Sequence, residues 1–212
     1  MSLPELERLV SVMARLRQEC PWDAQQTHRS LVQYLIEETA ETIEAIELAD
    51  QDHLREELGD LLLQVIFHAE IASEQTRGFT VEEVARGIAD KLISRHPYVF
   101  ATAEVPVDLH YTWEQRKAAE KGRTSALQGI PEQLSALARA NKIIGKARSR
   151  RVELVLPDEP TTAEEVGAQI LTLAARAQAS GIDPEQALRD AVRVLEAQVR
   201  HAESARHDAT PA

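Results

Sequence analysis

The feature that most constrains the fold is a run of acidic residues set inside apolar helical patterns between residues 36 and 60. Ten acidic residues stand there against a single basic residue, Arg55. On a helix, like charges three or four positions apart repel by roughly 0.2–0.5 kcal/mol per pair. A solvated acidic face is the usual explanation for such a run. The apolar residues around these carboxylates argue against that explanation.

The segment LGDLLLQVIFHAEIA, residues 58–72, is apolar nearly all round, which predicts a buried helix. Glu57, Asp60 and Gln64 form a narrow polar strip on this helix. In the preceding predicted helix, Glu37 and Glu41 lie on one edge of an apolar strip and Glu38 lies on the other. A short connector would make the two helices antiparallel neighbours. We therefore expect the two acidic strips to lie close together.

Buried carboxylates without partners are very costly, and no Lys or Arg in these two helices is placed to neutralise them. Carboxylate oxygens suit Mg²⁺ or Mn²⁺, and Mg²⁺ commonly accepts substrate phosphates as further ligands. The pattern therefore predicts a divalent-cation site. A di-iron site would need Glu-x-x-His pairs, which both helices lack. We expect His68, eight residues after Asp60, to be a partnered core or interface histidine.

The composition predicts an all-α fold, because aromatic residues make up only 4% and Gly and Pro are few. Periodicity and helix-end residues place the helices. The predicted helices lie near residues 4–18, 30–49, 53–75, 80–95, 112–122, 132–149, 162–180 and 184–205. Residues 97–111 are expected to form the longest irregular segment.

The formal net charge of −11 argues against a nucleic-acid polymer as partner, because such binders neutralise phosphates with Lys and Arg. Cys20 is the only cysteine, so no intrachain disulfide can form. The first residues lack a basic region leading into an apolar run, and no stretch of about 18 apolar residues occurs. We expect a cytoplasmic protein with no membrane partner.

A weak internal repeat divides the chain. EELGDLLLQVIFHAEIA, from Glu56, resembles EEVGAQILTLAARAQAS, from Glu164. The second copy keeps Glu165 as the counterpart of Glu57 but loses three polar residues: Ala168 stands for Asp60, Val194 for Lys91 and Gln198 for Arg95. It also lacks a counterpart of the EETAE segment. We therefore predict a catalytic domain at residues 1–122 and a degenerate, non-catalytic second copy at residues 123–212 with a frayed tail.

Several sequence blocks resemble the MazG-like nucleoside triphosphate pyrophosphohydrolases. EETAE (37–41) and ELGD (57–60) have the Glu-Glu-x-x-Glu and Glu-x-x-Asp pattern of that family. CPWDAQQTHRSLVQYLIEET, EELGDLLLQVIFHAEIA, DKLISRHPYVF and WEQRK follow in family order over residues 20–117. The resemblance implies an all-α fold whose four-helix unit is completed by a homodimer. It also implies Mg²⁺-dependent cleavage of a nucleoside triphosphate into a monophosphate and pyrophosphate.

By motif position, the resemblance implies that Glu38, Glu41, Glu57 and Asp60 are the metal ligands. Glu37 would complete the cluster, orient a ligand or act as a base toward water, and the sequence does not choose among these roles. Lys91 and Arg95, four residues apart, would hold the triphosphate. In WEQRK, the Trp113 indole would stack on a base while Lys117 meets a phosphate. Weaker candidates are Asp90, His96, Trp22, Asp23 and His28, the last three of which could equally pin the connector.

Three hypotheses follow. The first is a nucleotide pyrophosphohydrolase of broad specificity that clears damaged or noncanonical nucleotides. The second is a nucleotide- or metal-sensing regulatory protein without significant turnover. The third is a structural helical module, for which Mg²⁺ would leave the stability unchanged, whereas a metal that binds only the folded state must raise it.

Overall fold

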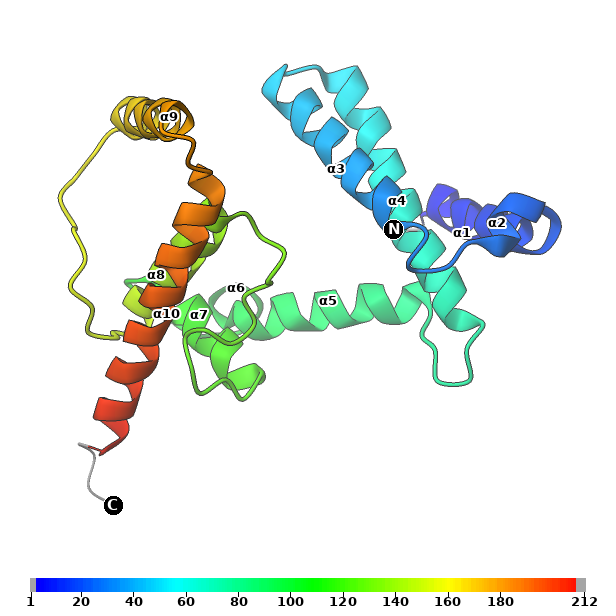
Figure 1. Cartoon of the computed structure of the whole chain (residues 1–212). Coiled ribbons are helices and arrows are strands. Elements are labelled where there is room, and N and C mark those ends of the chain that lie inside the picture. The colour runs from blue at the N-terminus through cyan, green and yellow to red at the C-terminus, as the bar shows by residue number, and fades with distance from the viewer. Residues whose placement is uncertain (1–2, 209–212) are drawn as a thin grey trace. The chain divides into compact units, whose positions relative to one another are not determined.

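The described residues, 3–208, of the computed structural model form ten helices and no strand (Figure 1). Their bounds are α1 Pro4–Glu19, α2 Pro21–Gln25, α3 Val32–Glu47, α4 Gln51–Ser73, α5 Val81–Arg95, α6 Pro97–Phe100, α7 Leu109–Glu120, α8 Ala136–Ser149, α9 Ala163–Ala179 and α10 Pro184–Asp208. The predicted all-α fold is confirmed. None of these helices is long and apolar enough to cross a membrane.

The eight predicted helices are all present, and most of their ends lie within a few residues of the expected positions. Two short helices, α2 and α6, were not predicted. Each begins at a proline, Pro21 or Pro97, whose fixed φ suits the first helical position. Each proline also follows closely after the end of the preceding helix, since α1 ends at Glu19 and α5 ends at Arg95. Residues 97–111 therefore contain a helical turn within the segment expected to be irregular.

The chain divides into two compact units, residues 1–96 and residues 97–212. In the first unit, α3 and α4 lie side by side as a hairpin (Figure 1). The three connecting residues include Ala49, whose φ of 55° turns the chain. The carboxylate of Asp50 then caps α4 by accepting the amides of Asp52 and His53, each at 3.1 Å. This tight connection fixes the two acidic helices against each other.

The core of the first unit lies where α1, α4 and the start of α3 meet. Its buried residues are Met13, Leu31, Ile66, Phe67 and Ile71. Arg17 secures the edge of this core, because its guanidinium donates to the Glu74 carboxylate and to the carbonyl oxygens of Asp23 and Gln26. The connector between α1 and α3 is thereby held against the far end of α4.

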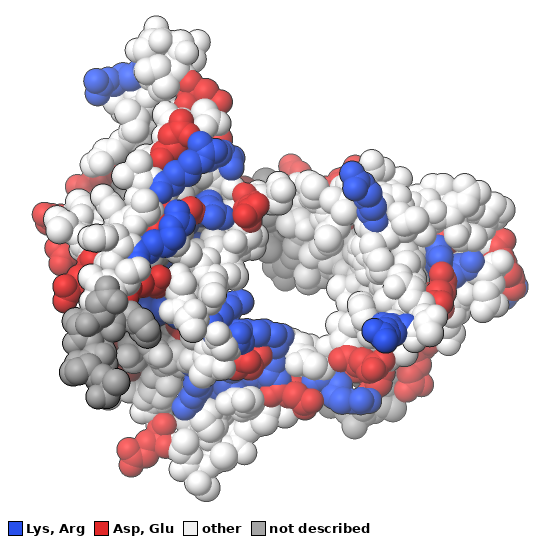
Figure 2. All heavy atoms as spheres, turned by 60° about the horizontal axis from the view of Figure 1, so that its bottom comes forward, with Lys and Arg blue, Asp and Glu red and all other residues white. Residues whose placement is uncertain are grey.

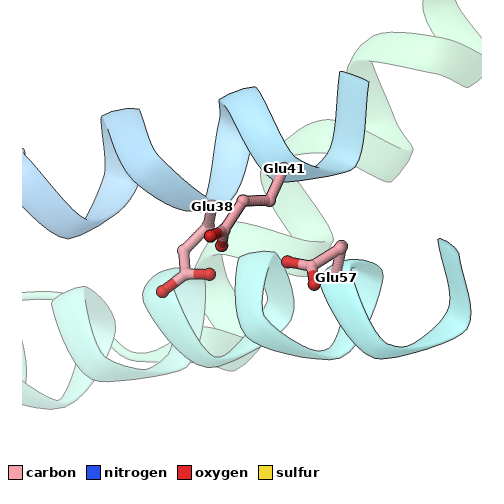
Figure 3. Close-up of side chains that lie close together, drawn as sticks. All are labelled: Glu38, Glu41 and Glu57. Carbon is pink, nitrogen blue, oxygen red and sulfur yellow. The ribbon is translucent and has the colours of Figure 1, made fainter. Parts of the chain in front are cut away.

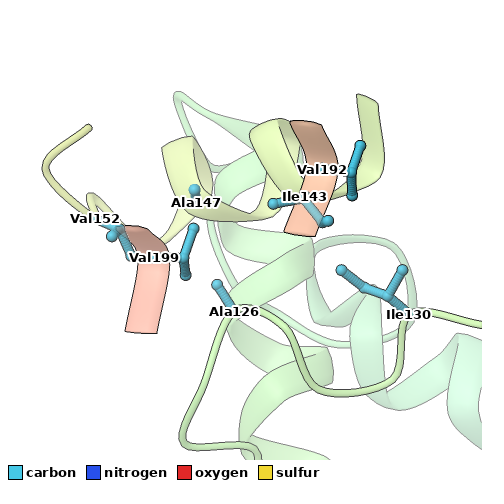
Figure 4. Close-up of a cluster of buried hydrophobic side chains, with 7 residues drawn as sticks. All are labelled: Ala126, Ile130, Ile143, Ala147, Val152, Val192 and Val199. Atoms are coloured by element: carbon cyan, nitrogen blue, oxygen red, sulfur yellow. The ribbon is translucent and has the colours of Figure 1, made fainter. Parts of the chain in front are cut away.

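The second unit has its own core, formed mainly by α8, α10 and the segment that precedes α8 (Figure 4). The buried residues are Ala126, Ile130, Ile143, Ala147, Val152, Val192 and Val199. Within this unit α7 packs against α8, and α9 packs against α10. The compact units divide after His96, whereas the predicted division by function falls after residue 122. A division by packing does not test a division by function, so the latter stays a prediction.

Candidate functional site

The α3–α4 hairpin brings three predicted carboxylates together (Figure 3). Glu38 and Glu41 project from one face of α3, because residues three apart are neighbours on a helix. Glu57 projects toward them from α4. One carboxylate oxygen of each residue lies within 4.8 Å of those of the other two. The acidic strips predicted from the helical wheel therefore do meet.

These carboxylates repel one another in a partly desolvated place. Burial raises the pKa of Glu38, and the negative charges of Asp60, Glu41 and Glu57 raise it further. The pKa of Glu41 is raised too, first by desolvation and then by the charges of Glu57, Glu37 and Asp60. A cation placed among the three oxygens would reverse this repulsion.

Glu57 provides the test of whether a metal ion fits the cluster. It is 6% exposed, and its Oε1 lies 3.0 Å from the His53 Nε2. Its Oε2 is buried and has no hydrogen-bond partner among the described residues. A buried carboxylate oxygen without a partner is rare, because its desolvation is not compensated. The donor set, all carboxylate oxygen, suits a hard divalent cation, so the residues present fit such an ion.

Asp60 and Glu37 lie at the margin of the cluster. Asp60 is half-buried on α4, one turn after Glu57, and its charge acts on Glu38 and Glu41. Its oxygens are not among the three that converge. Glu37 is exposed on α3 and its charge acts on the same two carboxylates. The structure thus brings together three of the four predicted metal ligands, and the role of Asp60 stays a prediction.

Two polar neighbours of the cluster were not assigned by the sequence analysis. His53 reaches Glu57 across one helical turn, and their spacing of four residues was the available indication. Gln64 had been placed on the polar strip of α4 but given no role. It is 5% exposed, and its Oε1 has no hydrogen-bond partner in the described part of the chain. Both side chains extend the polar strip within the hairpin.

The predicted phosphate and base contacts lie on α5 and α7. Lys91 is half-buried and Arg95 is 7% exposed near the end of α5, in the first unit. Trp113 and Lys117 are half-buried on α7, in the second unit, where Lys117 Nζ pairs with Glu114 Oε1 at 3.1 Å. Because the two pairs belong to different units, their joint action on one substrate stays a prediction.

Some of the weaker candidates have structural contacts. His96 Nδ1 lies 2.7 Å from the Leu92 carbonyl oxygen at the end of α5. His28 and His68 stack with 5.1 Å between ring centroids, and their Nδ1 atoms are 2.8 Å apart. His68 is thus the partnered histidine that was expected. Trp22 packs edge-on against Tyr34, so the connector is held by its own side chains.

Glu165, the counterpart of Glu57 in the predicted second copy, has different contacts from Glu57. Glu165 lies in the first turn of α9, where its Oε2 accepts the Thr162 amide at 2.9 Å. The Thr162 hydroxyl in turn accepts the Glu165 amide at 3.2 Å, which completes a capping box. These bonds lower the pKa of Glu165. The counterpart of Glu57 therefore stabilises the start of α9.

We expect Glu165→Gln to leave turnover unchanged and to alter the free energy of unfolding by less than about 1 kcal/mol, because Gln also serves in a capping box. Steady-state rates and urea unfolding would measure both quantities. A large loss of turnover in a folded variant would mean that the second copy takes part in the chemistry.

The chain is similar to one family of known proteins, both in a family model and in individual relatives. A family model described as the MazG nucleotide pyrophosphohydrolase domain matches residues 26–100. The "Nucleoside triphosphate pyrophosphohydrolase/pyrophosphatase MazG" of Thermotoga maritima is 40% identical over 209 residues, covering 88% of this chain and 81% of the relative. An uncharacterized 26.1 kDa protein of Streptomyces cacaoi is 45% identical over 199 residues, covering 92% and 81%. The crystal structure of a mazG-related protein from Thermotoga maritima aligns at 28% identity with a TM-score of 0.46, over 52% of this chain and 97% of that one.

Proposed function

The chain belongs to the MazG nucleotide pyrophosphohydrolase family, and on this premise we propose that its α3–α4 cluster hydrolyses nucleoside triphosphates with the help of Mg²⁺. The family predicted from the motifs is thereby confirmed, and with it the enzyme class, a nucleoside triphosphate pyrophosphohydrolase. The observation that carries the metal proposal is the convergence of Glu38, Glu41 and Glu57 around a buried oxygen without a partner.

We assign the cation to Glu38, Glu41, Glu57 and Asp60, with Mn²⁺ as a possible substitute. Bound there, the ion supplies charge neutralisation for the phosphates and acidifies water. Glu37 belongs to the outer part of the cluster, because its charge raises the pKa of both Glu38 and Glu41. His53 orients Glu57 through the 3.0 Å contact. The cluster is thus assembled by the α3–α4 hairpin.

We assign the substrate to cationic and aromatic side chains outside the cluster. Lys91 and Arg95 bind phosphate oxygens, Arg95 through a planar fork that suits two of them. Trp113 stacks on the base and Lys117 meets a phosphate. Water attacks phosphorus, the anhydride bond between the α and β phosphates breaks, and a monophosphate and pyrophosphate leave. Because stacking accepts almost any base, we propose a broad specificity that includes damaged nucleotides. We also propose a cytoplasmic location.

The function is tested by incubating the full chain with ordinary and modified nucleoside triphosphates, with Mg²⁺ or with excess chelator. Pyrophosphate and orthophosphate are then separated among the products. We expect monophosphate and pyrophosphate only when Mg²⁺ is present. Release of orthophosphate would contradict the proposed cleavage between the α and β phosphates. A folded protein that binds Mg²⁺ without turning over any nucleotide would instead be a sensor.

We also propose a homodimer, and the exposed face of α3 supports it. Val32, Ile36, Ile43 and Ile46 share this face and are 48%, 66%, 51% and 58% exposed. Their spacings of four, seven and three residues form one apolar strip along the helix. A strip of this kind on a soluble helix marks a protein contact. The same helix carries Glu38 and Glu41, so dimerisation would position the site as well.

Ile43→Glu is expected to convert the dimer to a monomer, because it places a charge in the middle of the apolar strip. Sedimentation velocity over a range of protein concentrations would measure the dissociation constant, which should rise at least about a hundredfold. Gln33→Glu adds the same charge to α3 outside the strip and should leave the dimer intact. A dimer that persists in Ile43→Glu would mean that another face forms the contact.

A further inference from the structure

The negative charge of the chain is unevenly distributed. Although the whole chain carries −11, the stretch from Thr112 to Arg151 has ten Lys and Arg residues against three Asp and Glu residues. This stretch runs through α7 and α8 in the second unit. On the face drawn in Figure 2, blue side chains gather over the part of the molecule that contains α8 and α10. An acidic protein therefore carries a basic region in its second unit, whereas its acidic cluster belongs to the first.

A cavity of about 530 Å³ lies within this basic region. It is lined by residues from α7, the segment after α7, the end of α8 and the last part of α10. Its charged lining consists of Arg123, Arg150 and Arg206 against one carboxylate, Glu203. The volume falls within the usual range for small-molecule sites. Trp113 and Lys117, the proposed substrate contacts on α7, are not part of this lining.

Hydrogen bonds to backbone carbonyl oxygens hold two of the three arginines, Arg150 and Arg206. Arg150 Nη2 donates to the Arg123 carbonyl oxygen at 3.1 Å, and Arg206 Nη1 donates to the carbonyl oxygens of Arg150 and Arg151 at 3.1 and 3.0 Å. The Arg123 guanidinium lies against Gly129, where a Cβ would come within 2.2 Å of its Nη2. Side chains that are held before a ligand arrives lose less freedom on binding.

A buried lysine lies within electrostatic reach of the same arginines. Lys146 is 7% exposed, and its Nζ donates to the Gln128 carbonyl oxygen at 2.6 Å. Burial lowers its pKa, and the charges of Arg123, Lys117 and Arg150 lower it further, while Glu114 opposes them. Cations therefore outnumber carboxylates around this buried ammonium, and an anion in the neighbourhood would stabilise all of them.

We propose that this cavity, lined only by residues of the second unit, binds a small phosphate-bearing anion without a metal ion. The guanidiniums of Arg123 and Arg150 make charge-assisted hydrogen bonds to phosphate oxygens. The ligand is either free pyrophosphate or the phosphate of a nucleotide, since both offer the same oxygens. The acidic cluster repels such anions unless a cation is present, so the two sites differ in their requirement for metal.

The test is isothermal titration calorimetry of the full chain in excess chelator, with inorganic pyrophosphate in one series and a nucleoside monophosphate in another. We expect saturable binding in at least one series, and the series that saturates identifies the source of the phosphate. Arg123→Gln and Arg150→Gln should each weaken binding about tenfold or more. Arg193→Gln, at an exposed arginine of α10 paired with Asp190, should leave it unchanged.

Lys91→Gln separates this site from the proposed substrate contacts. Binding that survives in Lys91→Gln and weakens in Arg123→Gln supports the cavity, whereas binding lost only in Lys91→Gln overturns it. Absence of binding of either anion to folded wild-type protein at millimolar concentration also overturns it. If Arg123→Gln fails to fold, Arg123→Lys keeps the charge without the planar fork and should still weaken binding. None of these outcomes depends on nucleotide turnover, so the proposed function stands or falls separately.

Discussion

Glu57→Gln is expected to reduce Mg²⁺-dependent turnover by at least about a hundredfold, because it removes the negative charge of the most buried carboxylate in the cluster. The substitution keeps the size of the side chain and an oxygen that can face the His53 Nε2. It also relieves repulsion on Glu38 and Glu41. The metal-free variant should therefore be at least as stable as the wild type, while Mg²⁺ should stabilise it less.

Initial rates at saturating Mg²⁺ and thermal unfolding with and without the ion would measure these effects. Glu44→Gln is the matched control, since Glu44 is an exposed glutamate on α3 outside the cluster. It should retain wild-type turnover and wild-type stabilisation by Mg²⁺. Full activity in Glu57→Gln, or equal loss in both variants, would show that the three converging carboxylates are not the metal site.

Helical periodicity was sufficient to predict the acidic hairpin. The wheel placed Glu57 on a polar strip of an otherwise apolar helix, and the short connector made α3 and α4 neighbours. The burial of Glu57 and its convergence with Glu38 and Glu41 follow from those two facts. The helix predicted over residues 80–95 is also present as α5, and Thr80 and Glu83 form a capping box at its start.

Side-chain contacts between distant residues were beyond the reach of periodicity. The stacking of His28 on His68 joins residues forty positions apart, and the cavity beside Arg123 also involves Arg206 from the last helix. The hydrophobic pattern of a single helix predicts neither the histidine stacking nor the cavity. The net charge of −11 likewise conceals the basic stretch through α7 and α8.

Glu57 and Glu165 differ in what their side chains contact. Both glutamates occupy matching positions of the repeat. Glu57 lies in the second turn of α4 and is buried against α3, whereas Glu165 lies in the first turn of α9 and caps it. The predicted second copy lacks a counterpart of the EETAE segment of α3, so its sequence offers no matching carboxylates to face Glu165. Glu165 instead caps the start of α9.

Asp60→Ala is expected to abolish turnover, with a loss of at least about a hundredfold, while the protein stays folded. We expect the fold to tolerate alanine at position 60, since Ala168 occupies the matching position of the predicted repeat in α9. Ala also has the highest helix propensity, so α4 should not be weakened. Asp60 lies one turn after Glu57, and its charge already acts on Glu38 and Glu41.

Rates measured over a range of Mg²⁺ concentrations distinguish the possible roles of Asp60. A metal ligand predicts that the variant needs much more Mg²⁺ and does not recover full rate. Circular dichroism and sedimentation velocity should show wild-type helix content and assembly. Retention of full Mg²⁺-dependent activity in Asp60→Ala would restrict the site to the three carboxylates that already converge, and would make Asp60 a residue that acts on them only through its charge.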